Sequence, residues 1–237
     1  MSDIYLFLGV LLIAACGWLG WQMRRLQVQL REVGGHLELR TTELESARLQ
    51  LQRLSTEDGL TALANHEQFL EFIEREWRRA RRDELSVSLV FLDIDHFRSY
   101  NRQFGRRAGD ECLRQIGRAL DGLAGRAGDL VARYHRDEFA VVLSSTDEAG
   151  AMRVAEKVRH SVEALEIPAA SDASGPMVTA SVAVASAVPN RQSAWEELDL
   201  IKAARHAMRE ARAEGGNRVR RAATDHAPTN LPVSLID

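Results

Sequence analysis

Hydrophobic residues recur along the chain with a period that changes from helical to extended and back several times between residues 56 and 221. A helical period predicts helices over residues 67–82, 108–123, 148–165 and 194–213. Short runs of apolar and β-branched residues predict strands over residues 85–94, 130–134, 139–143 and 177–188, with a short edge strand over 218–220. Helices that alternate with strands are typical of an α/β domain, in which helices flank a central sheet.

Residues 4–21 form an apolar run without a charged side chain. This length is close to the minimum that a helix needs to cross a bilayer. Asp3 precedes the run, and Arg24 and Arg25 follow it. Because positive charge marks the cytoplasmic side of a span, this order places the C-terminal part of the chain in the cytoplasm. We therefore expect residues 1–22 to be a single-pass transmembrane anchor.

Two other interpretations of this apolar run fit the sequence less well. A cleaved secretory signal carries basic residues before its apolar stretch, whereas here they follow it. Residues 13–16 resemble a lipoprotein cleavage box, but the apolar run continues past Cys16 and no basic residue precedes it. An uncleaved anchor explains both the charges and the length.

Residues 23–55 carry a heptad pattern that predicts a coiled coil. Its seam positions are spaced alternately four and three residues apart, namely Leu26, Leu30, Val33, Leu37, Arg40, Leu44, Ala47, Leu51 and Leu54. Arg40 is the polar exception, and Gly34 and Gly35 weaken the helix near its middle. An amphipathic helix packed on its own domain is the alternative. A parallel homodimer is favoured because the pattern lasts for about four heptads and connects a membrane span to a globular domain.

The chain thus divides into an anchor over residues 1–22, a connector over 23–55, a globular domain over 56–221 and a tail over 222–237. The tail contains two prolines and several hydroxyl-bearing residues, and we expect it to be disordered.

Composition and charge exclude some classes of function. Of the 237 residues, 27% are charged, and the net charge is only −3, so the chain as a whole does not attract nucleic acid. Cys16 and Cys112 are the two cysteines. Neither has the neighbours that a zinc site or a disulfide scaffold needs, so the sequence indicates neither of these.

Acidic residues gather at the ends of predicted strands. Asp93 and Asp95 come at the end of the strand over 85–94, and Asp137 and Glu138 lie in the link of the predicted hairpin. A carboxylate that ends a buried strand is costly to bury unless it binds something or reaches water there. Carboxylates from neighbouring strand ends can together hold Mg²⁺ on a nucleoside triphosphate.

Segments across the predicted domain resemble, in order, the motifs of the GGDEF-domain family of diguanylate cyclases. They are DGLTALAN at 58–65, DIDHFRSYN at 93–101, FGRRAGD at 104–110, RAGD at 126–129, HRDEF at 135–139, VTAS at 178–181 and ARAEGGN at 211–217. The resemblance covers residues 56–221. It implies the nucleotidyl-cyclase-like α/β fold, a ferredoxin-like palm whose central sheet is flanked by helices. The family hairpin normally begins Gly-Gly, and here His135 and Arg136 stand at those positions.

The resemblance also implies roles for individual residues. Asp93, the Ile94 carbonyl and Asp137 would bind Mg²⁺, and Asp137 or Glu138 would be the catalytic carboxylate. GTP would be bound by Asn101 and Asp110 at its guanine edge and by Arg98 and Arg212 at its phosphates. Arg126 and Asp129 would form the inhibitory site for cyclic di-GMP. The alternatives from local pattern alone are a helix cap and a solvated residue for Asn101 and Asp110, and a surface ion pair for Arg126 and Asp129.

Three departures from the family pattern bear on activity. Glycine lets a backbone approach a phosphate closely, and a non-glycine residue in a left-handed conformation costs about 1–2 kcal/mol. His135 and Arg136 remove both glycines of the hairpin, and Gly216 replaces an arginine usual in the closing motif. We therefore expect a degenerate cyclase of the bacterial inner membrane that binds cyclic di-GMP or GTP as a receptor or scaffold. An active, Mg²⁺-dependent, homodimeric diguanylate cyclase is the alternative, and a dimerisation module without a ligand is the third.

Overall fold

The computed structural model describes residues 18, 22–23, 56–123, 128–190 and 195–223. The chain divides into two units, residues 1–54 and 55–237, and the description below concerns the second. Among the described residues, no helix has the length and apolar content that crossing a membrane requires. Most of the predicted anchor, coiled coil and tail lies outside the described residues, so these three remain predictions.

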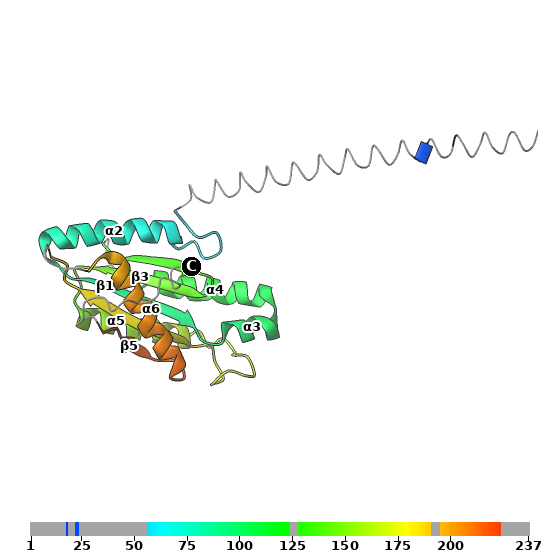
Figure 1. Cartoon of the computed structure of the whole chain (residues 1–237). Coiled ribbons are helices and arrows are strands. Elements are labelled where there is room, and N and C mark those ends of the chain that lie inside the picture. The colour runs from blue at the N-terminus through cyan, green and yellow to red at the C-terminus, as the bar shows by residue number, and fades with distance from the viewer. Residues whose placement is uncertain (1–17, 19–21, 24–55, 124–127, 191–194, 224–237) are drawn as a thin grey trace, which may run out of the picture. The chain divides into compact units, whose positions relative to one another are not determined.

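The described part of the second unit is an α/β domain, as the sequence predicts (Figure 1). Its helices are α2 (His66–Asp83), α3 (Phe97–Phe104), α4 (Arg106–Asp121), α5 (Glu148–Glu163) and α6 (Glu197–Ala213). Its strands are β1 (Val87–Ile94), β2 (Leu130–His135), β3 (Glu138–Ser144), β4 (Ala180–Ala187) and β5 (Val219–Arg221). The strands form one sheet in the order β2-β3-β1-β4-β5, in which only the β4–β5 pair is parallel.

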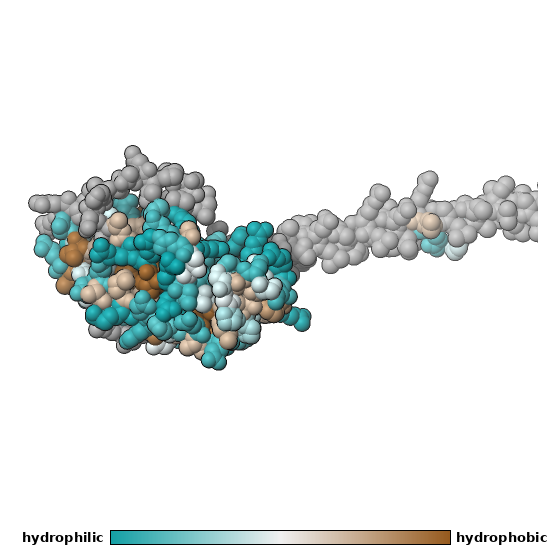
Figure 2. Space-filling model, turned by 90° about the horizontal axis from the view of Figure 1, so that it is seen from below, coloured by the Kyte–Doolittle hydropathy of each residue, from teal (hydrophilic) through white to brown (hydrophobic). Residues whose placement is uncertain are grey.

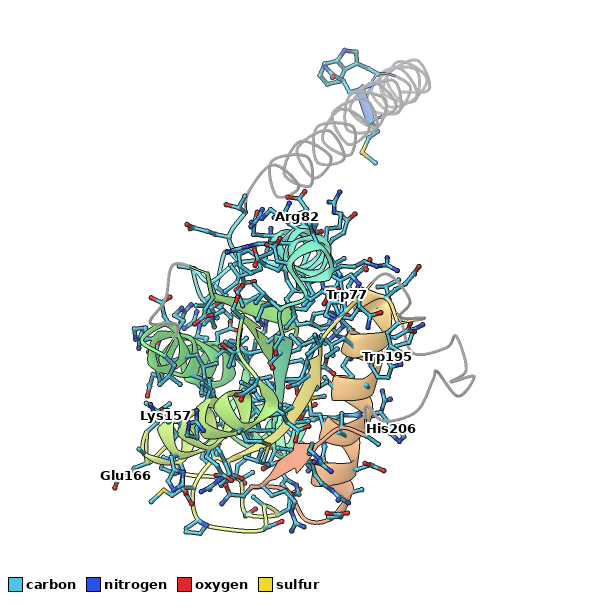
Figure 3. The ribbon with its side chains drawn as sticks, turned by 90° about the vertical axis from the view of Figure 1, so that its left-hand side faces the viewer. Trp77, Arg82, Lys157, Glu166, Trp195 and His206 are labelled. Atoms are coloured by element: carbon cyan, nitrogen blue, oxygen red, sulfur yellow. The ribbon has the colours of Figure 1, made fainter. Side chains whose placement is uncertain are left out.

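Strand β1 lies in the middle of this sheet and is buried on both faces, because its side chains alternate between two cores. Val90 and Leu92 pack with residues of α4 and α5, whereas Leu89 and Phe91 pack with residues of α2 and α6. Figure 3 shows the sheet between α4 and α5 on one side and α6 on the other. Burial on both faces explains why β1 is largely apolar, with Ser88 and Asp93 as its polar residues.

Local sequence fixes where the helices begin. Asn65 caps α2, since its side chain accepts a hydrogen bond of 2.8 Å from the backbone of Gln68. Asp147 caps α5 in the same way through Gly150. Helix α3 was not predicted as a separate element, and Gly105, at φ 83, ends it and begins α4.

The surface is largely polar on the face drawn in Figure 2, where hydrophobic residues form small separate areas. Large apolar side chains that are exposed in the described part of the domain include Phe104 and Val188. Single exposed apolar side chains are normal on protein surfaces.

Candidate functional site

The carboxyl end of β1 meets the start of β3, and this pairing brings the predicted acidic residues together. Asp93 lies opposite Glu138 in the β1–β3 register, and the Ile94 amide donates to the Asp137 carbonyl at 3.4 Å. Asp93 is only 5% exposed. Burial, together with the negative charges of Asp137, Glu138 and Asp95, raises the pKa of its carboxyl to about 7, against the lowering effect of Arg212. We call Asp93, Asp137 and Glu138 the acidic corner.

Two arginines of helix α6 contact this acidic corner. Arg212 places its Nη1 atom 3.1 Å from both carboxylate oxygens of Asp93. Arg205 places its Nη2 atom 3.3 Å from Oε2 of Glu138. Arg212, for which the sequence predicts phosphate binding, pairs in this structure with a predicted metal ligand. Arg205 was not predicted, although its position two helical turns before Arg212 puts it on the same helix face.

The hairpin turn is held by an arginine of its own first strand. Arg133 donates to the backbone carbonyl of Arg136 from Nε at 2.9 Å and from Nη2 at 2.6 Å. Arg136 has φ 27, whereas His135 belongs to β2 and takes no positive φ. The expected cost of a left-handed conformation therefore applies to Arg136 and was wrong for His135. Both side chains are exposed at the turn.

Arg133 also connects the hairpin to the segment before α2. Its Nη1 atom lies 3.1 and 3.2 Å from the two carboxylate oxygens of Asp58. Thr61 donates to Asp58 from its amide at 2.9 Å and its hydroxyl at 2.8 Å. Burial by itself would raise the pKa of Asp58, but the hydrogen bonds from Thr61 and the charge of Arg133 outweigh it and lower this pKa. The DGLTALAN segment thus stabilises the hairpin through the ion pair between Asp58 and Arg133.

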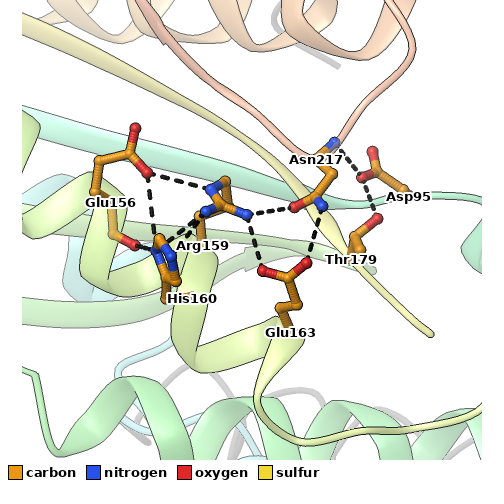
Figure 4. Close-up of polar contacts among 7 residues, drawn as sticks. All are labelled: Asp95, Glu156, Arg159, His160, Glu163, Thr179 and Asn217. Atoms are coloured by element: carbon orange, nitrogen blue, oxygen red, sulfur yellow. Dashed lines mark hydrogen bonds and ion pairs between the residues drawn. The ribbon is translucent and has the colours of Figure 1, made fainter. Parts of the chain in front are cut away.

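Both carboxylate oxygens of Asp95 accept hydrogen bonds from other parts of the domain. Its oxygens accept from the Ser181 hydroxyl at 2.6 Å, the Thr179 hydroxyl at 2.8 Å and the Asn217 amide at 2.9 Å. Figure 4 shows how Asn217 continues this network to Arg159, whose Nη1 atom donates to the Asn217 side chain at 2.8 Å. Asp95 therefore fixes the closing motif against the end of β1.

Helices α3 and α4 bring the two predicted guanine-binding residues into one region. Asn101 lies on α3 and Asp110 near the start of α4. The Oδ1 atom of Asn101 is buried and accepts no hydrogen bond from any residue that the structure describes. A Cβ atom at Gly109 would lie 1.8 Å from this Oδ1, so only glycine leaves room for it. A buried acceptor without a donor suits a ligand that donates. Arg98, on α3, is exposed.

The predicted inhibitory site lies at the other end of β3 from the hairpin. Asp129 accepts from the amide of Ser144, the last residue of β3, at 3.2 Å. It lines an open cavity of about 730 Å³ to which α5 contributes Arg153 and Lys157. Arg126 lies outside the described residues, so its pairing with Asp129 remains a prediction.

The sequence was also compared with models of known protein families. Residues 55–218 match the family described as "Diguanylate cyclase, GGDEF domain". The chain belongs to this family. The fold expected from the resemblance, a nucleotidyl-cyclase-like α/β domain, is the one that the structure has.

Curated relatives of this GGDEF protein include two from Escherichia coli. The chain is 31% identical to the probable diguanylate cyclase DgcC over 182 residues, which are 77% of this chain and 47% of DgcC. It is 34% identical to the diguanylate cyclase DosC over 163 residues, which are 68% of this chain and 34% of DosC. The chain thus spans about half or less of the relatives that it matches.

Solved GGDEF structures have the same fold. The GGDEF domain of DgcB from Caulobacter crescentus, in complex with cyclic di-GMP, is 26% identical with a TM-score of 0.63, covering 71% of this chain and 94% of that one. The GGDEF domain of YfiN from Pseudomonas aeruginosa is 30% identical with a TM-score of 0.59, covering 69% of this chain and 98% of that one.

The acidic corner offers carboxylate oxygens, which are the type of atom that a divalent cation takes as a ligand. Mg²⁺ prefers oxygen ligands and few of them, the rest being water and phosphate. No group of three or more His, Cys, Asp or Glu side chains in the described ranges is arranged to hold a metal ion. A site from Asp93, Asp137 and the Ile94 carbonyl would thus need ligands from the nucleotide. The clustered carboxylates that raise the pKa of Asp93 are the charge that such a cation would balance.

Proposed function

We propose that this chain is a membrane-anchored GGDEF-domain protein of cyclic di-GMP signalling that binds cyclic di-GMP or GTP as a receptor or scaffold and does not make cyclic di-GMP. The names of DgcC and DosC support the signalling system, and the cyclic di-GMP in the DgcB crystals supports the ligand. Both observations belong to other proteins, so the experiments below are designed to test each of them on this chain.

The structure of the hairpin turn is the main support for the proposal that this chain does not make cyclic di-GMP. His135 and Arg136 add two side chains where the family has none, and the Arg136 carbonyl is held by two donors from Arg133. A turn held in this way cannot move toward a phosphate without breaking those bonds. A misplacement of about 1 Å at a reacting group can lower a rate about a hundredfold.

Cyclic di-GMP binding is supported by the cavity beside Asp129. Arg153 and Lys157 bring two cations to this cavity, where they lie with the carboxylates of Glu84 and Asp147, and Asp129 offers a carboxylate that can accept from guanine. Arg126, three residues before Asp129, would add a guanidinium that can pair with phosphate or stack on a base.

An active cyclase is the second candidate, and the acidic corner favours it. In that reaction each 3′-hydroxyl attacks the α-phosphate of the other GTP, and pyrophosphate leaves. Mg²⁺ held by Asp93 and Asp137 would neutralise the phosphate charge. The buried Oδ1 of Asn101 would accept from guanine. Since one GTP lies on each protomer, the reaction needs a dimer.

Incubating the full chain with GTP and Mg²⁺ separates these two candidates. We expect no cyclic di-GMP above the level of a chain with Asp93→Asn and Asp137→Asn. Multiple turnovers per protomer would overturn the receptor proposal. The double variant His135→Gly with Arg136→Gly is expected to gain synthesis, because it restores the family hairpin. If it gains none, the defect lies elsewhere in the site.

Calorimetry with cyclic di-GMP tests the receptor role itself. We expect heat with the wild-type chain and at least a tenfold weaker Kd, about 1.4 kcal/mol, after Arg126→Ala. Asp121→Asn is a suitable control, because it removes an exposed carboxylate at the end of α4. No heat with cyclic di-GMP or GTP would favour a dimerisation module without a ligand.

The proposal extends to the N-terminal part as an inner-membrane anchor over residues 1–22 and a homodimeric coiled coil over residues 23–55. Membrane fractionation of the full chain tests the anchor, with a chain that starts at residue 23 as the comparison. Sedimentation of that shorter chain tests the coiled coil. We expect a dimer that becomes a monomer when Leu37 and Leu44 are replaced by Asp.

A further inference from the structure

Helix α5 contacts the closing motif, residues 211–217, through the side-chain amide of Asn217. Arg159 donates from Nη1 to Oδ1 of Asn217 at 2.8 Å, and Nδ2 of Asn217 donates to Oε1 of Glu163 at 3.2 Å (Figure 4). Arg159 also donates to Oε2 of Glu163 at 3.0 Å, so the three side chains form a closed ring of hydrogen bonds. The bonds from Asn217 and Arg159 lower the pKa of Glu163. We call Arg159 and Glu163 the α5 pair.

The α5 pair offers one donor and one acceptor, and this is the pattern that a carboxamide matches. The amide oxygen of asparagine only accepts, and its nitrogen only donates. An aspartate at position 217 would place a carboxylate oxygen against Glu163, and the two like charges would repel each other. Arg159 is well held for this role, since its side chain is only 15% exposed and its Nε atom also pairs with Glu156 at 3.2 Å.

Asn217 depends on such support because its backbone lies in the left-handed region. Its φ is 45, a conformation that is unfavourable for most residues other than glycine. The backbone amide of Asn217 donates to Asp95, just after the end of β1, at 2.9 Å. Asn217 therefore connects α5 to the end of β1 through its side chain and its backbone together.

The closing motif also ends helix α6. The amides of Gly215 and Gly216 donate to the carbonyls of Arg212 and Ala211, each at 3.2 Å. Bonds of this kind satisfy the last carbonyls of a helix and fix its final turn. Arg212 lies in that turn, and its side chain, which pairs with Asp93, is 49% exposed. An exposed guanidinium exchanges one anion for another at little cost, so Arg212 is free to take a phosphate.

We propose that the α5 pair positions Arg212 for a nucleoside triphosphate by holding Asn217 and, through it, the end of α6. Arg159 and Glu163 are positioning residues, because they act on the phosphate only through Asn217 and Arg212. Both lie outside the motifs that resemble the family. The inference rests on the GTP binding of the proposed function, and it adds residues that control this binding from a helix outside the acidic corner.

Calorimetry of the full chain with GTP and Mg²⁺ tests the proposal through a compensating pair of variants. Asn217→Asp should weaken the Kd for GTP about tenfold, because its carboxylate faces Glu163. Glu163→Gln alone should weaken it less, because its nitrogen meets the nitrogen of Asn217 at a half-exposed position. In the double variant the glutamine nitrogen donates to the aspartate, and the glutamine oxygen still accepts from Arg159. The double variant should therefore bind GTP within about threefold of the wild type.

Glu156→Gln is the matched control, because Glu156 pairs with Arg159 from one turn earlier on α5 and lies outside the ring of hydrogen bonds. It should leave the Kd for GTP unchanged. The Kd for cyclic di-GMP should be unchanged in every variant, whereas a general loss of folding would weaken both ligands. Equal GTP binding by the wild type and Asn217→Asp, or a double variant that binds no better than Asn217→Asp, would overturn the proposal.

Hydrogen exchange at the amides of Gly215 and Gly216 separates failure of this inference from failure of the proposed function. Both amides should exchange faster in Asn217→Asp and slow down again in the double variant. A wild type that binds no GTP would overturn the GTP binding of the proposed function, and the exchange rates would still decide whether the α5 pair holds the end of α6. Equal exchange in all variants would show that it does not. If Asn217→Asp fails to fold in a thermal melt, Glu163→Gln decides through the same two readouts.

Discussion

Gly216 lies against the carboxylate of Asp95, so that a Cβ atom at position 216 would be 2.8 Å from its oxygens. Gly216 has φ 72, a left-handed value that also favours glycine. Asp95 cannot retreat easily, because Thr179, Ser181 and the Asn217 amide all donate to it. From the sequence, Gly216 was interpreted as the loss of a phosphate-binding arginine. The structure adds that the backbone conformation and the contact with Asp95 both favour glycine at this position.

Gly216→Ala is therefore expected to destabilise the domain by about 3 kcal/mol, of which about 1–2 kcal/mol comes from the left-handed backbone and the rest from the contact with Asp95. Gly215→Ala separates the two causes, since Gly215 also has a positive φ, 110, and its added Cβ meets only the flexible side chain of Arg218, at 3.5 Å. Urea unfolding measures both. Equal losses in the two variants would show that the contact with Asp95 contributes nothing.

Restoring glycine at position 135 and at position 136 is expected to change the stability of the domain in opposite directions. Arg136→Gly relieves a positive φ and should stabilise the domain by up to about 1 kcal/mol. His135→Gly should destabilise it by a similar amount, because His135 belongs to strand β2 and glycine weakens strands. Thermal melts of the two single variants provide the measurement. Stabilisation by His135→Gly would contradict the strand assignment.

The sequence predicted elements well where apolar periodicity is long. The helix predicted over 148–165 is α5 at Glu148–Glu163, and that over 67–82 is α2 at His66–Asp83. Helix α3 was missed because it has only 8 residues between an acidic motif and a glycine. The strand predicted from residue 177 begins at Ala180, since Met177 forms only an isolated bridge with Pro168.

The sequence could predict only those residues of the candidate site that lie within recognisable motifs. The motifs that resemble the family indicated Asp93, Asp137 and Asn101 as site residues, because each of them lies within such a motif. They could not show that Arg205 lies beside Glu138, 67 residues away, or that Arg212 pairs with Asp93, 119 residues away. Such partners depend on how α6 packs across β1 and β4, which no local pattern records.

The raised pKa of Asp93 predicts a pH-dependent stability. The unfolded chain releases this proton near pH 3.8, whereas the folded domain holds it until about pH 7. The contribution of Asp93 to stability is therefore fully present below pH 3.8 and is lost as the pH rises towards 7, at up to about 1.4 kcal/mol for each pH unit. Asp93→Asn should flatten this slope in urea unfolding between pH 4 and pH 8.

Mg²⁺ provides an internal check on that slope, because only the ionised carboxylate binds it. Added Mg²⁺ should stabilise the wild-type domain more at pH 8 than at pH 5 and should leave Asp93→Asn nearly unchanged at both. A wild-type domain whose stability follows the same pH curve as Asp93→Asn would mean that Asp93 does not titrate in this range.

The planar guanidinium of Arg133 is expected to stabilise the hairpin turn through several hydrogen bonds of fixed geometry. Its three nitrogens reach the Arg136 carbonyl and both oxygens of Asp58, and its side chain is only 15% exposed. Arg133→Lys keeps the charge but offers a single point of contact, so it should still cost about 1–2 kcal/mol in urea unfolding and speed hydrogen exchange at the turn amides. Arg114→Lys is the control, because its exposed pair with Glu111 contributes little. Turn amides that exchange no faster in Arg133→Lys would mean that the β2–β3 ladder alone holds the turn.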